Sequence, residues 1–178
     1  MADQGSTGGF PEVVWGRPDT RAAEAGRWLV GTRAGSWLVR GLVPLDRWVL
    51  TRSKGRFTAL GPFGTPLLLL TTTGARTGLT RTTPLVYLHD GDRLLLAGSN
   101  FGRSSHPSWS ANLLADPEAT VTIGGRAVPV RARRLEGAER AQGWTKFCDA
   151  ARPYRVYGTR TDRSIRVFSL QRQAEETA

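Results

Sequence analysis

The side chains best suited to chemistry in this sequence gather in one stretch, residues 71–85. The apolar run 66–72 leads into residues 74–78, a short loop that carries hydroxyl groups, free backbone N–H groups and the guanidinium of Arg76, and Arg81 opens the next segment. Such amides and guanidinium groups are the donors that a phosphate or a carboxylate requires. The residues indicate either an anion site on a strand–turn–strand unit or an ordinary basic hairpin loop, and they leave both interpretations open.

Other catalytic patterns are missing from the sequence. It contains no Gly-x-Gly-x-x-Gly between a strand and a helix and no Gly-x-Ser-x-Gly, and residues 74–78 lack the Gly-Lys-Ser/Thr end of a phosphate-binding loop. His89 and His106 have no evident triad partners, and with Cys148 as the single cysteine a zinc site is disfavoured. Because acid–base groups are so few, the chemistry is expected to come from an organic cofactor.

Composition limits the class of protein. The chain has 178 residues, of which 39% are apolar and 22% charged, as in a single globular domain. The net charge of +10 and the pI of about 11.2 fit a nucleic acid, an anionic membrane surface or a polyanionic small ligand, and they also fit a genome rich in arginine codons. One cysteine, no signal peptide and no apolar run long enough to span a membrane predict a cytoplasmic protein.

Four segments are expected along the chain. Residues 1–25 are rich in Gly, Pro, Ser and Thr and are expected to be disordered. Residues 26–60 form an amphipathic helical segment with a tryptophan-rich face and an arginine-rich face. This segment either packs on the folded core or lies on a membrane surface through residues 28–52, and both interpretations stand. Residues 61–172 form the folded, cofactor-binding core, and residues 173–178 are a polar tail.

Alternation of apolar and polar residues predicts that this core is rich in β-structure. Strands are expected at 66–72, 81–89, 93–99, 119–123, 127–135 and 164–170, and helices at 107–114 and 137–151. Strands that follow one another with few crossover helices favour an antiparallel barrel over a doubly wound sheet. The fold class is therefore predicted as mainly β with flanking helices (α+β).

Several motifs add a family resemblance. They are Thr-Thr-Thr-Gly at 71–74, Arg81, Pro84-Leu85, Asp-Gly-Asp-Arg at 90–93, Ala-Gly-Ser-Asn at 97–100, His-Pro-Ser-Trp-Ser-Ala-Asn-Leu at 106–113, Asp116-Pro117, Tyr154, Tyr157 and Thr-Asp-Arg at 161–163. In this spacing, from about residue 66 to 168, the chain resembles the deazaflavin (F420)-dependent nitroreductase and quinone reductase family. The resemblance implies an antiparallel split β-barrel of the FMN-binding type. It also implies hydride transfer from reduced coenzyme F420 to a quinone, a nitroaromatic compound or an activated enone.

The resemblance further implies roles for particular residues. The phosphate and tail of the cofactor would meet Ala75, Arg76, Thr77 and Arg81, and its ring would run along Thr82, Thr83, Pro84, Leu85 and Val86. The opposite wall would consist of Ala97, Gly98, Ser99 and Asn100, with further contacts from Ser108, Trp109 and Asn112. Tyr154 would close over the ring, and Tyr157 would line the acceptor pocket. The proton that follows the hydride would come from Tyr154, Tyr157, Ser99 or a water molecule.

Some of these residues have simpler interpretations. Trp109 is also a typical core residue, Asn112 a typical loop brace, and Tyr154 and Tyr157 lie beside arginines, as surface aromatic residues do. The chain departs from the family pattern at four positions, which hold Ala75 in place of a basic residue, Thr83 in place of asparagine, Asn100 in place of lysine and Ala151 where some members have tyrosine.

Three alternatives to the F420 enzyme remain. The same barrel can use FMN, as related split-barrel oxidases do, or it can carry F420 without turnover. A basic β-barrel can also bind nucleic acid, but the Phe and Tyr residues form no evident stacking row on adjacent strands, so no nucleic-acid partner is expected. The expected partner is a small-molecule acceptor, and the chain is expected to be a monomer or a homodimer.

Overall fold

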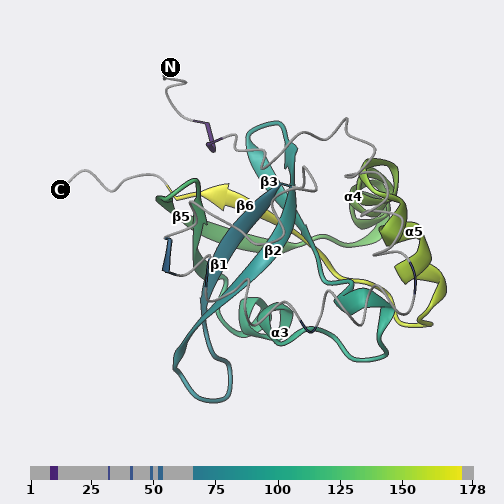
Figure 1. Ribbon diagram of the computed structural model, residues 1–178, viewed down its shortest axis with the longest axis horizontal. Coiled ribbons are helices and arrows are strands. Elements are labelled where there is room, and N and C mark those ends of the chain that lie inside the picture. Colours follow the sequence, from purple (N-terminus) through teal and green to yellow (C-terminus); the bar gives the residue numbers. More distant parts are fainter. Residues whose placement is uncertain are drawn as a thin grey trace.

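The computed structural model describes residues 9–11, 32, 41, 49, 52–53 and 66–173 (Figure 1). The elements of residues 66–173 are β1 (Leu67–Thr73), β2 (Thr80–Asp90), β3 (Arg93–Ala97), the 3-10 helix η2 (Asn100–Gly102), α3 (Ser108–Ala115), β4 (Glu118–Ile123), β5 (Arg126–Arg134), α4 (Gly137–Ala150), α5 (Arg152–Thr159) and β6 (Val167–Arg172). All strand pairs in this part of the chain are antiparallel, and the order β1-β2-β3-β6-β5-β4 closes into a barrel. The predicted fold class is therefore confirmed.

Short turns produce this arrangement. β4 and β5 are joined by Gly124 and Gly125, whose φ angles of 57° and 86° lie in the left-handed region that glycine adopts without steric cost. Two pairs, β1 with β4 and β3 with β6, then close the barrel by joining strands that are far apart in the sequence. Helix α3 lies at one end of the barrel, and α4 and α5 lie together along one side (Figure 1).

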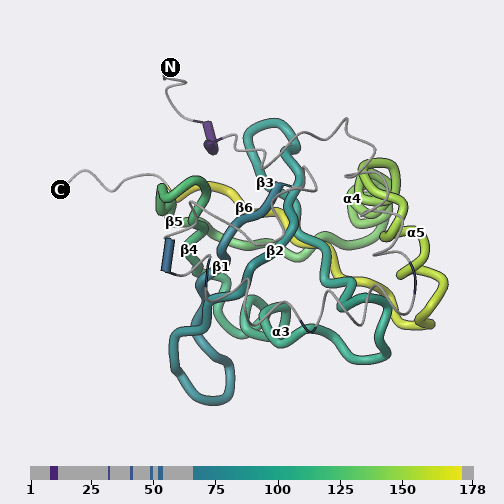
Figure 2. Tube along the Cα trace, in the orientation of Figure 1, coloured from purple at the N-terminus to yellow at the C-terminus, as the bar shows by residue number. Residues whose placement is uncertain are grey.

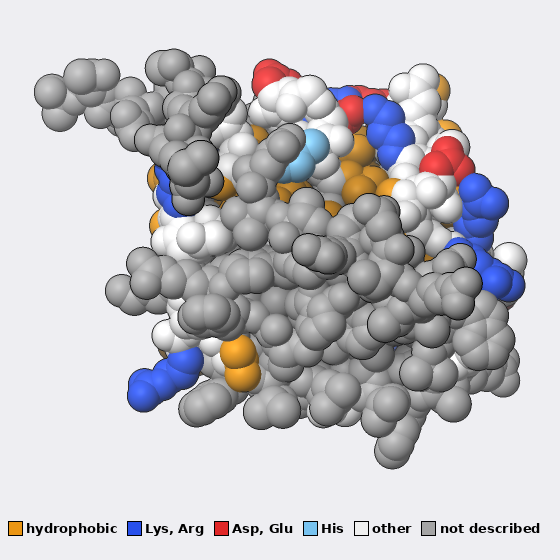
Figure 3. Space-filling view, turned by 45° about the horizontal axis from the view of Figure 1, so that its top comes forward, with side chains coloured by type: hydrophobic (Ala, Val, Ile, Leu, Met, Phe, Trp, Pro, Cys, Tyr) orange, Lys and Arg blue, Asp and Glu red, His pale blue; other side chains and the backbone are white. Residues whose placement is uncertain are grey.

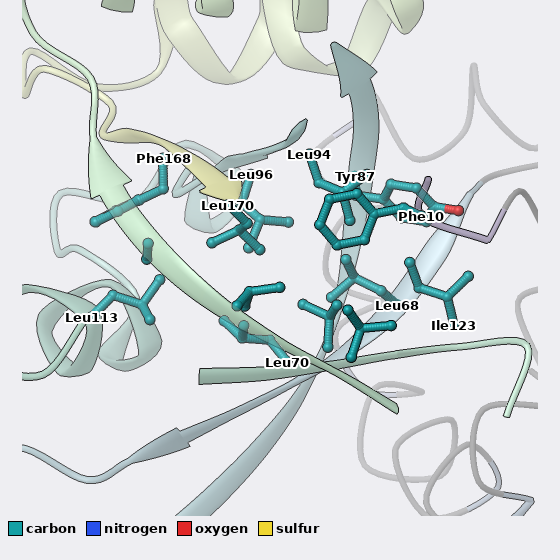
Figure 4. Close-up of a cluster of buried hydrophobic side chains, with 14 of the residues drawn as sticks. Phe10, Leu68, Leu70, Tyr87, Leu94, Leu96, Leu113, Ile123, Phe168 and Leu170 are labelled. Atoms are coloured by element: carbon teal, nitrogen blue, oxygen red, sulfur yellow. The ribbon is translucent and has the colours of Figure 1, made fainter. Parts of the chain in front are cut away.

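Apolar side chains from alternate strand positions fill the barrel. On β5, Val128, Val130 and Ala132 are buried while the residues between them are exposed. Trp109 of α3 lies against Phe168 of β6, with ring centroids 5.6 Å apart, so α3 covers this end of the barrel. Figure 4 shows part of the core cluster, in which Leu68, Leu70, Leu94, Leu96 and Leu170 meet from the three strands β1, β3 and β6.

A second buried cluster joins α4 to the outside of the barrel. Its buried members are Leu95, Leu135, Phe147 and Val167. Beside this contact, the Glu139 carboxylate of α4 accepts hydrogen bonds from Arg133 at 2.6 Å and from Arg93 at 2.8 Å. These guanidinium groups lower the pKa of Glu139 to about 2. Packing and charge together fix α4 to β3 and β5.

One residue of the N-terminal segment differs from the expectation of disorder for residues 1–25. Phe10 is 8% exposed and packs in the barrel core, beside Tyr87 and Leu94 (Figure 4). Burial of a phenylalanine offsets part of the entropy lost when its neighbours become ordered. A composition rich in Gly and Ser does not indicate such an anchor.

Other predicted segments lie largely outside the described residues. Within residues 26–60 the structure describes only positions 32, 41, 49 and 52–53, so the amphipathic helical segment and the membrane interpretation of residues 28–52 stay predictions. Residues 174–178 of the polar tail are also outside. Among the helices that the structure does describe, none has the length and apolar content needed to cross a bilayer.

Several elements differ from those predicted, and β6, for example, begins at Val167 and not at residue 164. Helix α5 was not expected, although Pro153 in its first turn is a typical helix-start residue. β3 ends at Ala97 and not at residue 99. Pro107 is the N-cap of α3 and not its first helical residue, because its carbonyl already accepts from the Ser110 amide at 3.1 Å.

Candidate functional site

The turn between β1 and β2 is closed by its own backbone and projects beyond the barrel (Figure 2). The Gly74 amide donates to the Leu79 carbonyl at 2.9 Å, and the Gly74 carbonyl accepts from Thr77 and Gly78 at 3.1 and 2.8 Å. A Cβ on Gly74 would lie 2.9 Å from the Thr77 hydroxyl and 3.0 Å from the Leu79 carbonyl oxygen. The turn therefore requires glycine at position 74.

The amides of this turn are not the free anion donors that the sequence predicts. Besides those already named, the Ala75 amide donates to the Asn112 side-chain oxygen at 3.1 Å. Among the described residues, Arg76 holds the one amide at the tip of the turn without an acceptor. The exposed guanidinium groups of Arg76 and Arg81 supply the capacity for an anion, since neither has a carboxylate partner in the described part of the chain.

Asn112 braces this turn from α3. Its side-chain amide donates to the Thr72 hydroxyl at 3.0 Å, and its side-chain oxygen accepts from the Ala75 amide. The residue is 7% exposed, so both ends of its side chain are used inside the protein. The geometry favours the brace over a direct cofactor contact for Asn112.

The other two predicted contacts on α3 differ in access. The Trp109 ring is 6% exposed and belongs to the barrel core, which favours the structural interpretation for this residue. Ser108 is exposed at the start of α3, where the helix dipole favours an anion. Of the pair, only Ser108 has an exposed side chain.

β2 has an edge that no described strand covers over its first half. β1 pairs with β2 along residues 80–86, whereas β3 pairs with β2 only along residues 87–90. The Tyr87 amide points toward β1, because it donates to the Pro66 carbonyl at 3.3 Å. Since backbone groups alternate in direction along a strand, the groups that point to the uncovered edge are those of Thr82, Pro84 and Val86. Proline is tolerated in a strand where its missing N–H would face such an edge.

Side chains on β2 alternate in the same way. Leu85 packs against the core cluster, so Thr83 and Leu85 face the barrel, while Thr82, Pro84 and Val86 face outward. The Thr82 hydroxyl lies 3.1 Å from that of Thr71. The five predicted ring contacts on β2 therefore form two groups. Thr82, Pro84 and Val86 direct their backbone groups to the uncovered edge, whereas Thr83 and Leu85 direct neither side chain nor backbone to it.

The predicted wall begins where the uncovered edge of β2 ends. Leu96 is the last residue of β3 paired with β2, and Ala97, which follows it, packs against the outer cluster under α4. The Gly98 amide donates to the Arg166 carbonyl at 2.8 Å. Asn100 has a φ of 48°, and its side chain donates back into its own loop, to the Ser105 carbonyl at 3.0 Å. The asparagine is uncharged and its side chain is engaged within the loop. It therefore does not supply the positive charge that lysine gives this position in the family pattern.

The two tyrosines sit in an aromatic cluster on α5. Tyr154 lies 4.9 Å from Phe147, 6.0 Å from Trp144 and 5.9 Å from Tyr157, measured between ring centroids. Tyr157 is 5% exposed and also meets Phe101, at 5.8 Å. The interpretation of these tyrosines as surface aromatic residues is wrong. Tyr154 also packs against the same outer cluster as Ala97, so the tyrosines adjoin the predicted wall.

Tyr154 is expected to remain protonated in the folded protein well above the usual pKa of a phenol. Burial, with a smaller contribution from Tyr157, raises the pKa of Tyr154 above the ordinary value of about 10. Because the folded state then holds a proton that the unfolded state releases, stability is expected to fall as the pH rises through that value. Tyrosinate absorbance during a pH titration measures this, with Tyr154→Phe as the comparison. A wild-type curve in which all three tyrosines titrate together while the protein stays folded would contradict it.

Positive side chains of the described residues do not gather in one patch on the face of the molecule in Figure 3. Figure 3 shows Lys and Arg side chains at several separate places around the edge of one face, among the residues that it colours. Of the arginines near the wall, Arg163 donates to the carbonyls of Gly98 and Ser99 and was not predicted as a site residue. Its place in the Thr-Asp-Arg motif is the one signal in the sequence that could have identified it.

The chain is similar to known proteins over most of this fold. The family model of F420H(2)-dependent quinone reductase matches residues 45–172. An F420H(2)-dependent quinone reductase of Mycobacterium tuberculosis (strain ATCC 25618 / H37Rv) is 34% identical over 144 residues, which cover 77% of this chain and 97% of that protein. A further quinone reductase of the same strain is 31% identical over 106 residues, covering 60% and 89% of the two chains.

Solved structures agree with these relatives. An F420-H2 dependent reductase (FDR-A) is 39% identical with a TM-score of 0.55, and the match covers 60% of this chain and 94% of that one. A second structure, described as a domain-swapped dimer, is 36% identical with a TM-score of 0.56, covering 72% and 99%. The family model covers most of the chain, the Mycobacterium tuberculosis relative is 34% identical, and the fold is the expected antiparallel barrel, so the chain belongs to the F420H(2)-dependent quinone reductase family.

Proposed function

We propose that this chain transfers a hydride from reduced coenzyme F420 to a quinone, and that nitroaromatic compounds and activated enones also serve as acceptors. Membership of the F420H(2)-dependent quinone reductase family makes the chain an oxidoreductase with coenzyme F420 as its cofactor. The observation that carries the proposal is the uncovered edge of β2, which has exposed arginines at one end and the tyrosine cluster beyond the other.

The residues present fit this cofactor. A deazaflavin needs hydrogen-bond partners along one edge of its ring, and the backbone groups of Thr82, Pro84 and Val86 offer both donors and acceptors. Its phosphodiester and glutamate tail need cations, and the guanidinium groups of Arg76 and Arg81 are exposed. The donor set therefore suits a long ligand that is planar at one end and anionic at the other.

Bound deazaflavin supplies a hydride for a two-electron reduction, and the chain's own residues orient the reactants and move the proton. Arg76 and Arg81 hold the anionic part, which keeps the ring in register with the β2 edge. Burial raises the pKa of Tyr154, which makes it a hydrogen-bond donor and a weaker acid, and the proton that follows the hydride comes from Tyr154, Tyr157, Ser99 or a water molecule. The aromatic cluster around Tyr154 keeps water away from that end of the site.

A fluorescence titration of the protein with oxidised F420, with FMN run alongside, tests the cofactor, and turnover of reduced F420 tests the acceptor. Tight binding of F420 with weak binding of FMN is expected, together with faster oxidation of reduced F420 when a quinone such as menadione is added. Binding without turnover by any quinone, nitroaromatic compound or enone would make the chain a carrier of F420. Preferential binding of FMN would keep the barrel and change the redox chemistry.

Assembly and location form a second part of the proposal. A solved relative that is 36% identical is described as a domain-swapped dimer, and this supports a homodimer for this chain, which sedimentation velocity would test against a monomer. The single cysteine supports a reducing, cytoplasmic location.

A further inference from the structure

One guanidinium organises the loop that leads away from the predicted wall. The Arg163 side chain donates from Nη2 to the carbonyls of Ser99 and Gly98, at 2.7 and 3.1 Å, and from Nε to the carbonyl of Arg103, at 2.8 Å. Its Nη1 lies 3.1 Å from Nδ1 of His106. A single side chain thus holds both ends of residues 98–106, a segment about 60 residues away in sequence.

This loop needs an external support because its backbone is strained. Asn100 and Phe101 have φ angles of 48° and 56°, in the left-handed region that costs non-glycine residues roughly 1 kcal/mol or more each. Among the described residues, the one backbone–backbone hydrogen bond from this loop to the segment before β6 runs from the Gly98 amide to the Arg166 carbonyl, at 2.8 Å. The Ser99 carbonyl also accepts from the Gly102 amide at 2.9 Å, whereas the Gly98 carbonyl has Arg163 as its donor, so Arg163 fixes the direction of Gly98 and reinforces that of Ser99.

The Arg163 guanidinium bonds to three carbonyl oxygens and an imidazole nitrogen, and it forms no ion pair with a carboxylate in the described part of the chain. It bonds His106, and the positive charge of Arg166 acts on it. Burial, and then Arg166 and Arg163 themselves, lower the pKa of His106, so the imidazole is neutral and its Nδ1 accepts from Arg163. The hydrogen bonds of the guanidinium all go to residues of the loop, and this indicates that Arg163 determines the shape of that loop.

We infer that Arg163 is a positioning residue for the cofactor. The inference rests on the proposed function, in which Ala97, Gly98, Ser99 and Asn100 form one wall of the F420 site. Arg163 does not touch the ligand in this assignment. It fixes Gly98 and Ser99 from behind, so that the wall is already in place when F420 binds, and the ligand does not have to order it.

Lysine at this position separates geometry from charge. An ammonium group on a flexible stem retains the positive charge but cannot reach four acceptors that lie in the directions of a planar fork. Arg140→Lys is the matched control, because the Arg140 guanidinium also donates to a backbone carbonyl, that of Ile165 at 2.9 Å, but on a segment outside the wall.

The experiment compares wild type, Arg163→Lys, Arg163→Gln and Arg140→Lys in steady-state turnover of reduced F420 with a saturating quinone. Arg163→Lys is expected to raise KM for the cofactor about tenfold with kcat changed by less than about twofold, and Arg163→Gln to raise KM further. Arg140→Lys is expected to leave KM unchanged. Hydrogen exchange of residues 98–106 is expected to quicken in the Arg163 variants and to slow again when F420 is added.

The outcomes are separable. If wild type neither binds nor oxidises reduced F420, the proposed function fails first. If wild type turns over and Arg163→Lys leaves KM unchanged, or lowers kcat alone as a smaller active fraction would, the positioning role is overturned. If both Arg163 variants fail to fold while Arg140→Lys folds, Arg163 is a residue of the fold, and the inference is overturned in the same way.

Discussion

Arg81→Ala is expected to raise the dissociation constant for oxidised F420 by about 10- to 100-fold. A hydrogen bond to a charged group contributes about 1.5–3 kcal/mol, and the exposure of Arg81 places the effect toward the lower part of that range. Arg81→Lys, which retains charge but not the planar fork, is expected to lie between wild type and alanine. The cofactor's own fluorescence measures all three, and the difference between them should shrink as salt is added.

Arg126→Ala is the control for this prediction. Arg126 is also an exposed arginine on a strand, but it follows the β4–β5 turn and not the β1–β2 turn. Equal losses of affinity in the two variants would mean that net charge, and not a contact at the β1–β2 turn, attracts the cofactor. Unchanged affinity in Arg81→Ala would remove this residue from the site and leave Arg76 as the cation to test.

Gly102→Ala is expected to lower the free energy of unfolding by about 2–4 kcal/mol and to reduce turnover. Gly102 has a φ of 76°, and a Cβ there would lie 2.7 Å from Arg160 Cβ and 2.9 Å from the Tyr157 carbonyl oxygen. The methyl group can be accommodated only if η2 and α5 move apart. Because α5 carries the tyrosines, such a shift displaces them from the wall. Urea unfolding measures the first effect, and kcat with a quinone measures the second.

Gly91→Ala separates backbone strain from this contact. Gly91 has a similar φ, 68°, but nothing lies within 4 Å of the position of its added Cβ. It is therefore expected to lose about 1 kcal/mol, the cost of the left-handed conformation alone, with turnover unchanged. Equal destabilisation of the two variants would show that the steric contact between η2 and α5 adds nothing to the loss of unfolding free energy.

Local pattern was enough to predict the strands and turns, because adjacent strands joined by Gly91-Asp92 and Gly124-Gly125 need no knowledge of distant residues. Helix α5 was missed because Arg152, Arg155 and Gly158 obscure the spacing of its two tyrosines, even though that spacing is helical. Phe10 was missed because a single aromatic residue in a segment rich in glycine has no periodic context.

The site residues are predicted through the resemblance, which does not give the directions of their side chains and backbone groups. The resemblance groups residues 82–86 as one set of ring contacts, but alternation along β2 directs the side chains of Thr83 and Leu85 toward the barrel. The amides of residues 74–78 were expected to be free, but one of them bonds Asn112, which is 37 residues further along the chain. Contacts of this kind depend on tertiary packing and cannot be read from local spacing.

The place of β6 in the barrel has a consequence for how the protein is made. β6 is the last of the described strands along the chain, and it inserts between β3 and β5, whose inner edges face each other across the gap that it fills. A ribosome releases the other five strands first, and until β6 emerges those two edges have no partner. Barrel closure is therefore a late step, and it pairs strands that are far apart in the sequence. Contacts between distant residues make folding slow. A chain cut before Val167 should form intermolecular sheets through the same two edges.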